Sequence, residues 1–333
     1  MYNINELRLI IKQQLNKTKN MAKNANLHAA KNAKNDEFYT QLSDVEKELK
    51  HYKEFFNGKK VLCNCNDDKW SAFFKYFSMN FEHLGLKQLV CVSYNENGKG
   101  KKYVYNGDLN NNRMVDDWEV NVTELNGNGD FSSDECVELL KDCDVVVTNP
   151  PFSLFRDFVA LLQQYEKKFL IIGNGNAVTY KEIFPLIKDN KMWIGCSKGI
   201  GGQMCFIVQD DYDGKYVEEI NGQKIAQVNN AAWFTNIPHA KRNQPLDLYK
   251  KYKSEEYSKY DNYDAINVDK TSDIPMDWSG VIGVPITFLD KYCPTQFEIV
   301  GIANSARYIG SFPCLTIIDG KKIYNRILIR KLA

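Results

Sequence analysis

The chain has 333 residues, which is enough for one large domain and a smaller one. Its hydrophobic content of 44% and charged content of 26% are ordinary for a globular protein, and no apolar stretch approaches the roughly 20 residues that cross a bilayer. The net charge of +1 argues against a protein that coats nucleic acid through its overall charge. The nine cysteines, an odd number set mostly in apolar runs, and the absence of a signal-peptide pattern predict free thiols and a cytoplasmic location.

Residues 1–35 form a basic stretch at the start of the chain. Between Leu7 and Asn35 there are seven Lys and Arg side chains and no Asp or Glu. Such a stretch is either a solvated leader or an arm that neutralises phosphates, and arms of this kind often become ordered only on binding. We therefore predict a basic N-terminal arm over residues 1–35.

Short apolar runs alternate with helical patterns in the first two thirds of the chain. The predicted strands are residues 61–65, 88–94, 144–148 and 168–173. The predicted helices are residues 43–56, 70–84, 133–141, 153–165 and 179–189, the first with a capping box made by Ser43 and Glu46. Residues 95–128 are polar, with weak strand signals at 102–105, and are interpreted as an insertion. This alternation predicts an α/β fold with a doubly wound, mostly parallel sheet.

The pattern changes beyond Lys191 to short strand-like runs. These runs cover residues 192–194, 204–209, 216–220, 231–235, 298–303, 315–318 and 323–329. The change predicts a smaller, irregular C-terminal module that begins near Pro238.

The most informative motif is Asn149-Pro150-Pro151-Phe152, between the apolar run 144–148 and the helical pattern 153–165. It is therefore predicted to lie at the carboxyl end of a buried strand, where open α/β sheets bind their ligands. The two prolines restrict φ and lack a backbone N–H, so the loop is rigid.

The groups of this loop suit a planar ring that carries an exocyclic amino group. The side-chain oxygen of Asn149 and the carbonyl of Pro150 can accept the two amino hydrogens, and Phe152 can stack on the ring. A plain Pro-Pro turn after a core strand is the alternative. The motif resembles the catalytic loop of amino-group methyltransferases that use S-adenosyl-L-methionine, whose targets include adenine in DNA, a base in RNA and glutamine in a protein.

Polar residues near other predicted elements are candidates for binding the methyl donor. Asn64, Asn66 and Asp67 follow the first strand, where a Gly-rich turn is common, although this turn has no Gly. Asp67 can meet the donor's amino group or ribose, with a helix N-cap as the alternative. Asp130 can accept from the donor's adenine amino group while Phe131 packs on its ring, with a simple Gly-Asp turn as the alternative.

The chain as a whole resembles the EcoRI-type adenine-specific DNA methyltransferases over residues 34–305. The matching segments are Asp36–Gln41, Val61–Asp67, Phe73–Phe77, Val147–Arg156, Ile171–Asn174, Trp233–Asn236, Tyr260–Val268 and Gly283–Leu289. The resemblance implies a Rossmann-like methyltransferase domain over residues 36–237, a target-recognition region over residues 238–333 and S-adenosyl-L-methionine as cofactor. It also implies N6 methylation of an adenine flipped out of double-stranded DNA, at a GAATTC-like site within a restriction-modification system.

The same resemblance gives roles to further residues. It implies contacts to the donor from Phe38, Tyr39 and Thr40. It implies that the turn after the first strand replaces the usual Gly-rich turn. The place of the flipped base would be lined by Pro151, Trp233 and Phe234, with core packing as the alternative for the Trp-Phe pair.

DNA contacts are predicted for Lys241 and Arg242, which begin a basic, aromatic-interleaved stretch; such charges usually bind phosphates. Residues 199–224 depart most from the family, which leaves the target sequence open. We expect a monomer whose activity does not require a cognate restriction endonuclease, and the existence of such a partner stays open. We expect no metal site, because Cys63 and Cys65 lack a matching Cys or His pair. The alternatives that stay open are a methyltransferase for an RNA base or a protein glutamine, and a non-catalytic DNA-binding homologue.

Overall fold

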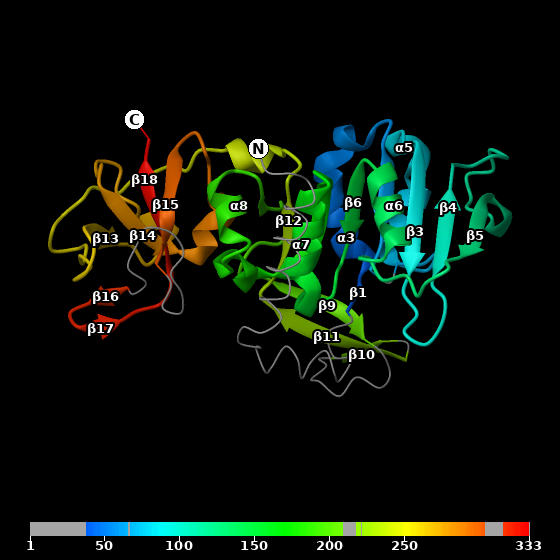
Figure 1. Ribbon diagram of the computed structural model, residues 1–333. Coiled ribbons are helices and arrows are strands. Elements are labelled where there is room, and N and C mark those ends of the chain that lie inside the picture. The colour runs from blue at the N-terminus through cyan, green and yellow to red at the C-terminus, as the bar shows by residue number, and fades with distance from the viewer. Residues whose placement is uncertain (1–37, 66, 209–217, 221, 304–315, 333) are drawn as a thin grey trace, which may run out of the picture.

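The computed structural model describes residues 38–65, 67–208, 218–220, 222–303 and 316–332 (Figure 1). The predicted basic arm, residues 1–35, and the candidate donor-binding residue Asn66 lie outside the described residues. Within the described residues the fold is mixed α/β, with one large sheet, two four-stranded sheets and a two-stranded hairpin.

The large sheet has the strand order β5-β4-β3-β2-β6-β7-β12-β8. Its strands in that order are Val120–Glu124, Lys101–Tyr105, Gln88–Ser93, Lys60–Cys63, Val145–Thr148, Lys168–Asn174, Ala231–Thr235 and Trp193–Ile194. The four central strands, β3, β2, β6 and β7, pair in parallel. The strand order reverses at β2, because the chain runs from β2 outward to β3 and then returns to β6 on the other side of β2.

The prediction of a mostly parallel sheet holds only for these four central strands. The pairs β3–β4, β4–β5, β7–β12 and β12–β8 are antiparallel. β4 and β5 arise from the segment that we interpreted as an insertion. The connection between β3 and β4 is short, so the chain folds back as a hairpin, and a hairpin requires antiparallel pairing.

Both faces of the large sheet are covered by helices, because successive strand residues point to opposite faces. On β2, Val61 and Cys63 pack on one face and Leu62 packs on the other. The first face carries α3 (Leu42–Leu49), η1 (Lys50–Phe56), α4 (Ala72–Met79) and α5 (Phe81–Leu84). The second face carries α6 (Asp134–Asp142), α7 (Phe155–Gln164) and α8 (Phe184–Lys188). The predicted capping box is wrong: α3 begins directly after Gln41, so Ser43 is already inside the helix.

A four-stranded sheet with the order β1-β9-β11-β10 crosses the end of the large sheet to which the β3 arrow points (Figure 1). Its strands are Tyr39–Thr40, Gln203–Val208, Gln223–Asn229 and Glu218–Ile220. β1 pairs with β9 in antiparallel register, with Tyr39 opposite Ile207 and Thr40 opposite Phe206. Segments that are far apart in the chain therefore meet at the carboxyl ends of the central strands.

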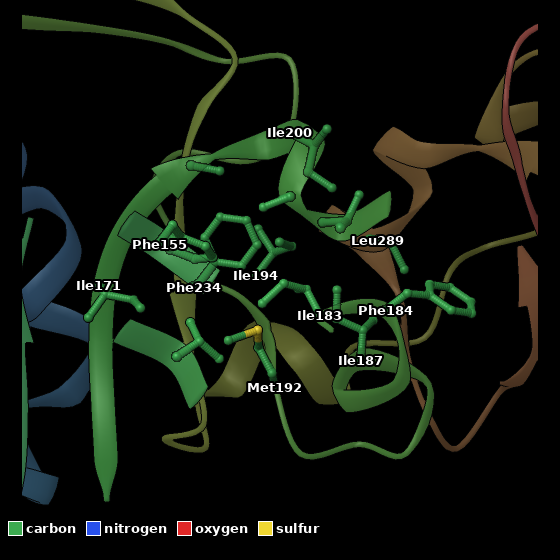
Figure 2. Close-up of a cluster of buried hydrophobic side chains, with 14 of the residues drawn as sticks. Phe155, Ile171, Ile183, Phe184, Ile187, Met192, Ile194, Ile200, Phe234 and Leu289 are labelled. Carbon is green, nitrogen blue, oxygen red and sulfur yellow. The ribbon is translucent and has the colours of Figure 1, made fainter. Parts of the chain in front are cut away.

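The last four-stranded sheet has the order β13-β14-β18-β15 and is built from the C-terminal part of the chain. Its strands are Ala265–Asn267, Val281–Pro285, Arg326–Lys331 and Phe297–Ala303, and the hairpin strands β16 and β17 are Ile317–Ile318 and Lys321–Lys322. Leu289, in the 3-10 helix η7 (Ile286–Lys291), lies in one buried cluster with Ile183, Phe184 and Ile200 (Figure 2). A continuous core therefore joins this sheet to the large one.

Short 3-10 helices complete the described elements. They are η2 (Asp117–Glu119), η3 (Phe152–Leu154), η4 (Gly175–Thr179), η5 (Ala240–Asn243) and η6 (Thr271–Asp273). No helix among the described residues combines the length and the apolar character that crossing a membrane requires.

Candidate active site

The Asn-Pro-Pro-Phe motif lies between a strand and a helix, as predicted. Buried β6 ends at Thr148, Asn149 and Pro150 form the loop, and Pro151 caps η3, which leads directly into α7. The main-chain N–H of Leu154 donates to the Pro151 carbonyl over 2.9 Å, which closes the turn. The motif therefore lies at the carboxyl end of a central parallel strand, next to the point where the strand order reverses.

The side-chain amide of Asn149 has a fixed orientation. Its Nδ2 donates to the main-chain carbonyl of Phe38 over 2.7 Å. Its Oδ1 is buried and has no hydrogen-bond partner among the described residues. A buried oxygen without a partner is costly unless a ligand donates to it. Asn149 therefore presents an acceptor, as the sequence predicts.

A cavity of about 960 Å³ opens beside Asn149. This volume is at the upper end of the range of about 300–1,000 Å³ that is usual for small-molecule sites. The cavity brings together eight of the residues singled out from the sequence, namely Phe38, Tyr39, Thr40, Asp67, Asp130, Phe131, Asn149 and Pro151. The small sheet closes the cavity through Ile207 and Val208 of β9 and Gln223 and Ile225 of β11.

The turn after β2 reproduces a glycine conformation without a glycine. Cys65 has a φ of 67°, in the left-handed region that costs a residue with a Cβ about 1–2 kcal/mol. Cys65 lines the cavity, and burial raises the pKa of its thiol well above the ordinary value, so the turn presents a neutral sulfur. Asn64 is buried behind the cavity wall and does not line it.

Asp67 is the buried acid of the cavity, and its carboxyl is held from the neighbouring strand. Its Oδ2 lies 2.6 Å from the hydroxyl of Thr148, and that hydroxyl also contacts the main-chain carbonyl of Asn64. Burial raises the pKa of the Asp67 carboxyl to about 8, and the hydrogen bond from Thr148 opposes that rise. At neutral pH the carboxyl is therefore mostly protonated unless a cation lies beside it.

Asp130 and Phe131 reach the cavity because Gly129 brings the chain against the end of β3. Gly129 has a φ of +85°, and a Cβ at this position would lie 2.3 Å from the main-chain oxygen of Ser93. Asp130 accepts from the N–H and hydroxyl of Ser132 at 2.8 and 2.6 Å. It therefore also stabilises a turn, which is the alternative interpretation of the Gly-Asp pair. Phe131 packs edge-on against Phe158, with ring centroids 5.0 Å apart.

Phe152 and Pro150 do not line the cavity. The Phe152 ring is half-buried, and its centroid lies 5.6 Å from that of Phe38. Phe38 in turn lies 5.4 Å from Phe206 of β9. These three rings connect the motif to the small sheet, and Pro150 is buried in the turn.

Trp233 and Phe234 lie in the core, outside the cavity. Trp233 packs edge-on against Phe73 at 6.2 Å, and Phe234 packs against Phe155 at 5.0 Å. Both side chains are fully buried. These contacts agree with the alternative interpretation that Trp233 and Phe234 pack in the core and do not line the place of the base.

Lys241 and Arg242 also lie outside the cavity, in η5. The Lys241 ammonium donates to the main-chain carbonyl of Cys196 over 3.0 Å. The Arg242 guanidinium stacks on the Trp193 ring at 4.1 Å and donates to the Asn190 side chain over 2.5 Å. Both side chains therefore hold η5 against the large sheet.

The cavity also contains residues that the sequence reasoning did not single out. Tyr94 and Glu96 follow β3, Trp70 precedes α4, and Lys75 lies within α4. Glu96 could have been found, because it follows a predicted strand just as Asp67 does. Among the described residues no group of three or more His, Cys, Asp or Glu side chains is arranged to hold a metal ion.

Comparison with known proteins identifies the class to which this fold and cavity belong. The family described as "Adenine-specific methyltransferase EcoRI" matches residues 26–331. The chain therefore belongs to this family of adenine-specific methyltransferases, and it is an enzyme of the restriction-modification type that methylates DNA.

Three relatives match over nearly their whole length. The Type II methyltransferase M.EcoRI of Escherichia coli is 47% identical over 330 residues, covering 93% of this chain and 98% of the relative. M.MgeORF184P of Mycoplasma genitalium is 40% identical, covering 91% of this chain and 97% of the relative. M.MpnI of Mycoplasma pneumoniae is 39% identical, with the same coverage of 91% and 97%. No solved structure matches the chain.

Proposed function

We propose that the protein transfers a methyl group from S-adenosyl-L-methionine to the N6 amino group of an adenine flipped out of double-stranded DNA. The observation that carries this proposal is the buried Oδ1 of Asn149, which has no partner among the described residues. Its orientation is set by the bond from Nδ2 to the Phe38 carbonyl, so the oxygen and not the nitrogen is left for a ligand. An adenine amino group supplies the donor that this oxygen lacks.

The residues of the cavity fit S-adenosyl-L-methionine. This donor is cationic at its amino group and its sulfonium, and the cavity carries the acids Asp67, Glu96 and Asp130. Phe131 offers an aromatic ring for the adenine, and Glu96 can accept from the ribose hydroxyls. The Thr40 hydroxyl is buried in the cavity wall with no partner among the described residues, and a polar group of the donor would satisfy it. When bound, S-adenosyl-L-methionine supplies an electrophilic methyl group.

The motif prepares the amino group for attack. Adenine N6 is a poor nucleophile because its lone pair is delocalised into the ring. Asn149 Oδ1 accepts one of its hydrogens, and the carbonyl of the adjacent Pro150, a residue outside the cavity lining, is assigned the other. Together they draw the nitrogen toward a tetrahedral geometry, which localises the lone pair. Phe152 stacks on the base and offsets part of the few kcal/mol that flipping requires. Once the methyl group has been transferred, the amino group is acidic and its proton leaves to water.

The domain organisation that we propose follows from the sequence and from the family. It consists of an arm (1–35), a catalytic domain of Rossmann-like methyltransferase type (36–237) and a target-recognition region (238–333). Lys241 and Arg242 are candidates for DNA contacts from the sequence, but we propose a structural role for them, because both make contacts within the protein. We propose a cytoplasmic monomer that acts on a GAATTC-like site and does not require a cognate endonuclease for its activity. Membership of an adenine-specific family argues against the two rival substrates, an RNA base and a protein glutamine.

Methyl incorporation tests the proposal directly. The purified protein is incubated with S-adenosyl-L-methionine that carries a labelled methyl group and with plasmids that contain or lack GAATTC. We expect label on adenine in the first plasmid and none in the second. Label in both plasmids would retain the chemistry and reject the GAATTC-like target. Label found only in RNA or protein controls would reject DNA as the substrate.

A further inference from the structure

Thr148 is the last residue of β6 and directly precedes Asn149, yet the mechanism above gives it no role. Its side chain is fully buried. Its hydroxyl lies 2.6 Å from Asp67 Oδ2 and also contacts the main-chain carbonyl of Asn64. Asn64 and Asp67 belong to the turn after β2, so this one hydroxyl bridges the turn beside the donor cavity and the strand that ends at the catalytic loop.

The hydrogens of this cluster can be counted. A hydroxyl has one hydrogen to donate, while Thr148 faces two acceptors, the Asn64 carbonyl and the Asp67 carboxyl. If Asp67 carries a proton, it donates to the Thr148 oxygen, and Thr148 donates to Asn64. If Asp67 is ionised, the Thr148 hydroxyl can turn and donate to the carboxylate. The Thr148 hydroxyl can therefore hydrogen-bond to the Asp67 carboxyl in either protonation state of the carboxyl.

We propose that Thr148 is a positioning residue for the methyl donor, whose hydroxyl holds the Asp67 carboxyl toward the donor's amino group and anchors it to the strand that carries Asn149. The proposal rests on the proposed function, because it takes S-adenosyl-L-methionine as the ligand of the cavity. Of the two carboxyl oxygens, Oδ2 is engaged by Thr148, and the Ser71 side chain also hydrogen-bonds to the carboxyl. Asp67 also lines the cavity, so the bond from Thr148, together with that from Ser71, fixes how the carboxyl faces the ligand.

Thr148→Val tests the proposal, because valine keeps the shape and removes the hydroxyl. We expect the dissociation constant for S-adenosyl-L-methionine to rise about tenfold or more, in line with the loss of a hydrogen bond to a charged group. Turnover at saturating donor and DNA should change little, because the Asn149 amide is bound elsewhere, at Phe38. Thr148→Ser should restore most of the affinity.

Thr235→Val is the matched control. Thr235 is also a fully buried threonine, and its hydroxyl donates to the Phe169 carbonyl over 2.7 Å, outside the cavity. Both valine variants lose a buried hydroxyl and should lower the melting temperature. Only Thr148→Val should weaken donor binding. Equal affinities in the two variants and the wild type, or equal losses in both, would overturn the proposal.

The pH dependence of donor binding distinguishes this positioning role from a purely structural one. Loss of a purely structural hydrogen bond would leave the pH at which donor affinity falls unchanged. Thr148 donates to the ionised form of Asp67, so its removal should raise the pH at which donor affinity falls off on acidification. Asp67→Asn should weaken binding by itself, and adding Thr148→Val should cost little more, because both changes remove one interaction. Additive losses would overturn the proposal. A wild-type protein that does not bind S-adenosyl-L-methionine would instead reject the proposed function.

Discussion

The side-chain amide of Asn149 donates to the main-chain carbonyl of Phe38 over 2.7 Å, across 111 positions of the chain. Phe38 directly precedes β1, which is paired to β9 in the small sheet that closes the cavity. The Asn-Pro-Pro-Phe loop is therefore oriented from the wall of the cavity and not from its own strand. The orientation of Asn149 therefore depends on this wall, which is itself held by the pairing of β1 with β9.

Asn149→Ala should reduce turnover about 100-fold to 1,000-fold, as the loss of one preorganised hydrogen-bonding group commonly does. The dissociation constant of S-adenosyl-L-methionine should stay close to that of the wild type, because Asn149 is assigned to the amino group of the base. Single-turnover methylation and calorimetric titration measure the two quantities. Asn236→Ala is the control, since this amide also bonds main-chain groups but lies outside the cavity. Comparable turnover in Asn149→Ala would contradict the assignment.

Donor affinity should depend on pH through Asp67. Burial raises the pKa of this carboxyl from 3.8 to about 8. In the free protein the carboxyl is therefore mostly protonated at pH values below about 8. A cationic donor favours the ionised form, so the proton must leave on binding. Affinity should therefore rise by up to about tenfold per pH unit as the pH increases from 6 toward 8. Titrations at several pH values should show this slope in the wild type and a flat profile in Asp67→Asn.

Gly129→Ala should destabilise the protein by about 1–3 kcal/mol, because the residue has a φ of +85° and no room for a Cβ beside the Ser93 carbonyl. Since Asp130 and Phe131 follow directly, donor affinity should fall as well. Gly127→Ala is the matched control, because a Cβ there meets no atom within 4 Å. Thermal melting with and without donor compares the two. Equal melting temperatures for both variants would refute the steric explanation.

Trp70 should report the binding of the donor. Its side chain is 67% exposed and lines the cavity, whereas Trp118 is 63% exposed and does not. Addition of S-adenosyl-L-methionine should change the intrinsic tryptophan emission. Most of that change should disappear in Trp70→Phe and persist in Trp118→Phe. A signal that survives in Trp70→Phe would mean that the ligand binds away from this wall.

Arg242→Gln should lower the melting temperature, because it removes the stacking on Trp193 and the hydrogen bond to Asn190. DNA binding at several salt concentrations separates this role from a phosphate contact. Loss of one phosphate contact reduces the slope of log affinity against log salt by about 0.9. We expect the slope to stay unchanged. A reduced slope would restore Arg242 to the DNA interface.

The elements around Asn149 could be predicted because each one has a local signal. The Val run gives β6, the prolines give the turn, and the amphipathic pattern gives α7. The rule that ligands bind at strand ends led to Asp67, and the same rule applied to β3 would have led to Glu96. The directions of β4 and β5 could not be predicted in this way, because chain reversal and not local pattern sets them.

The closing wall of the cavity also escaped prediction. Ile207 and Ile225 are ordinary strand residues, and no feature of the sequence distinguishes them from other isoleucines in strands. Their place depends on the pairing of β1 with β9 and of β9 with β11. The left-handed backbone conformation of Cys65 could not be predicted either. A glycine at this position would have suggested a positive φ, whereas a cysteine does not.

The pairing of Tyr39 with Ile207 also sets the order in which the site can form during synthesis. β1 leaves the ribosome early, but its partner strand follows only after the whole of β2 to β8. Closing so long a loop carries an entropic cost and slows folding relative to local contacts. The nascent chain can therefore assemble its central strands before the wall that closes the cavity can form. Protection by S-adenosyl-L-methionine against proteolysis should appear only in chains that extend past β11.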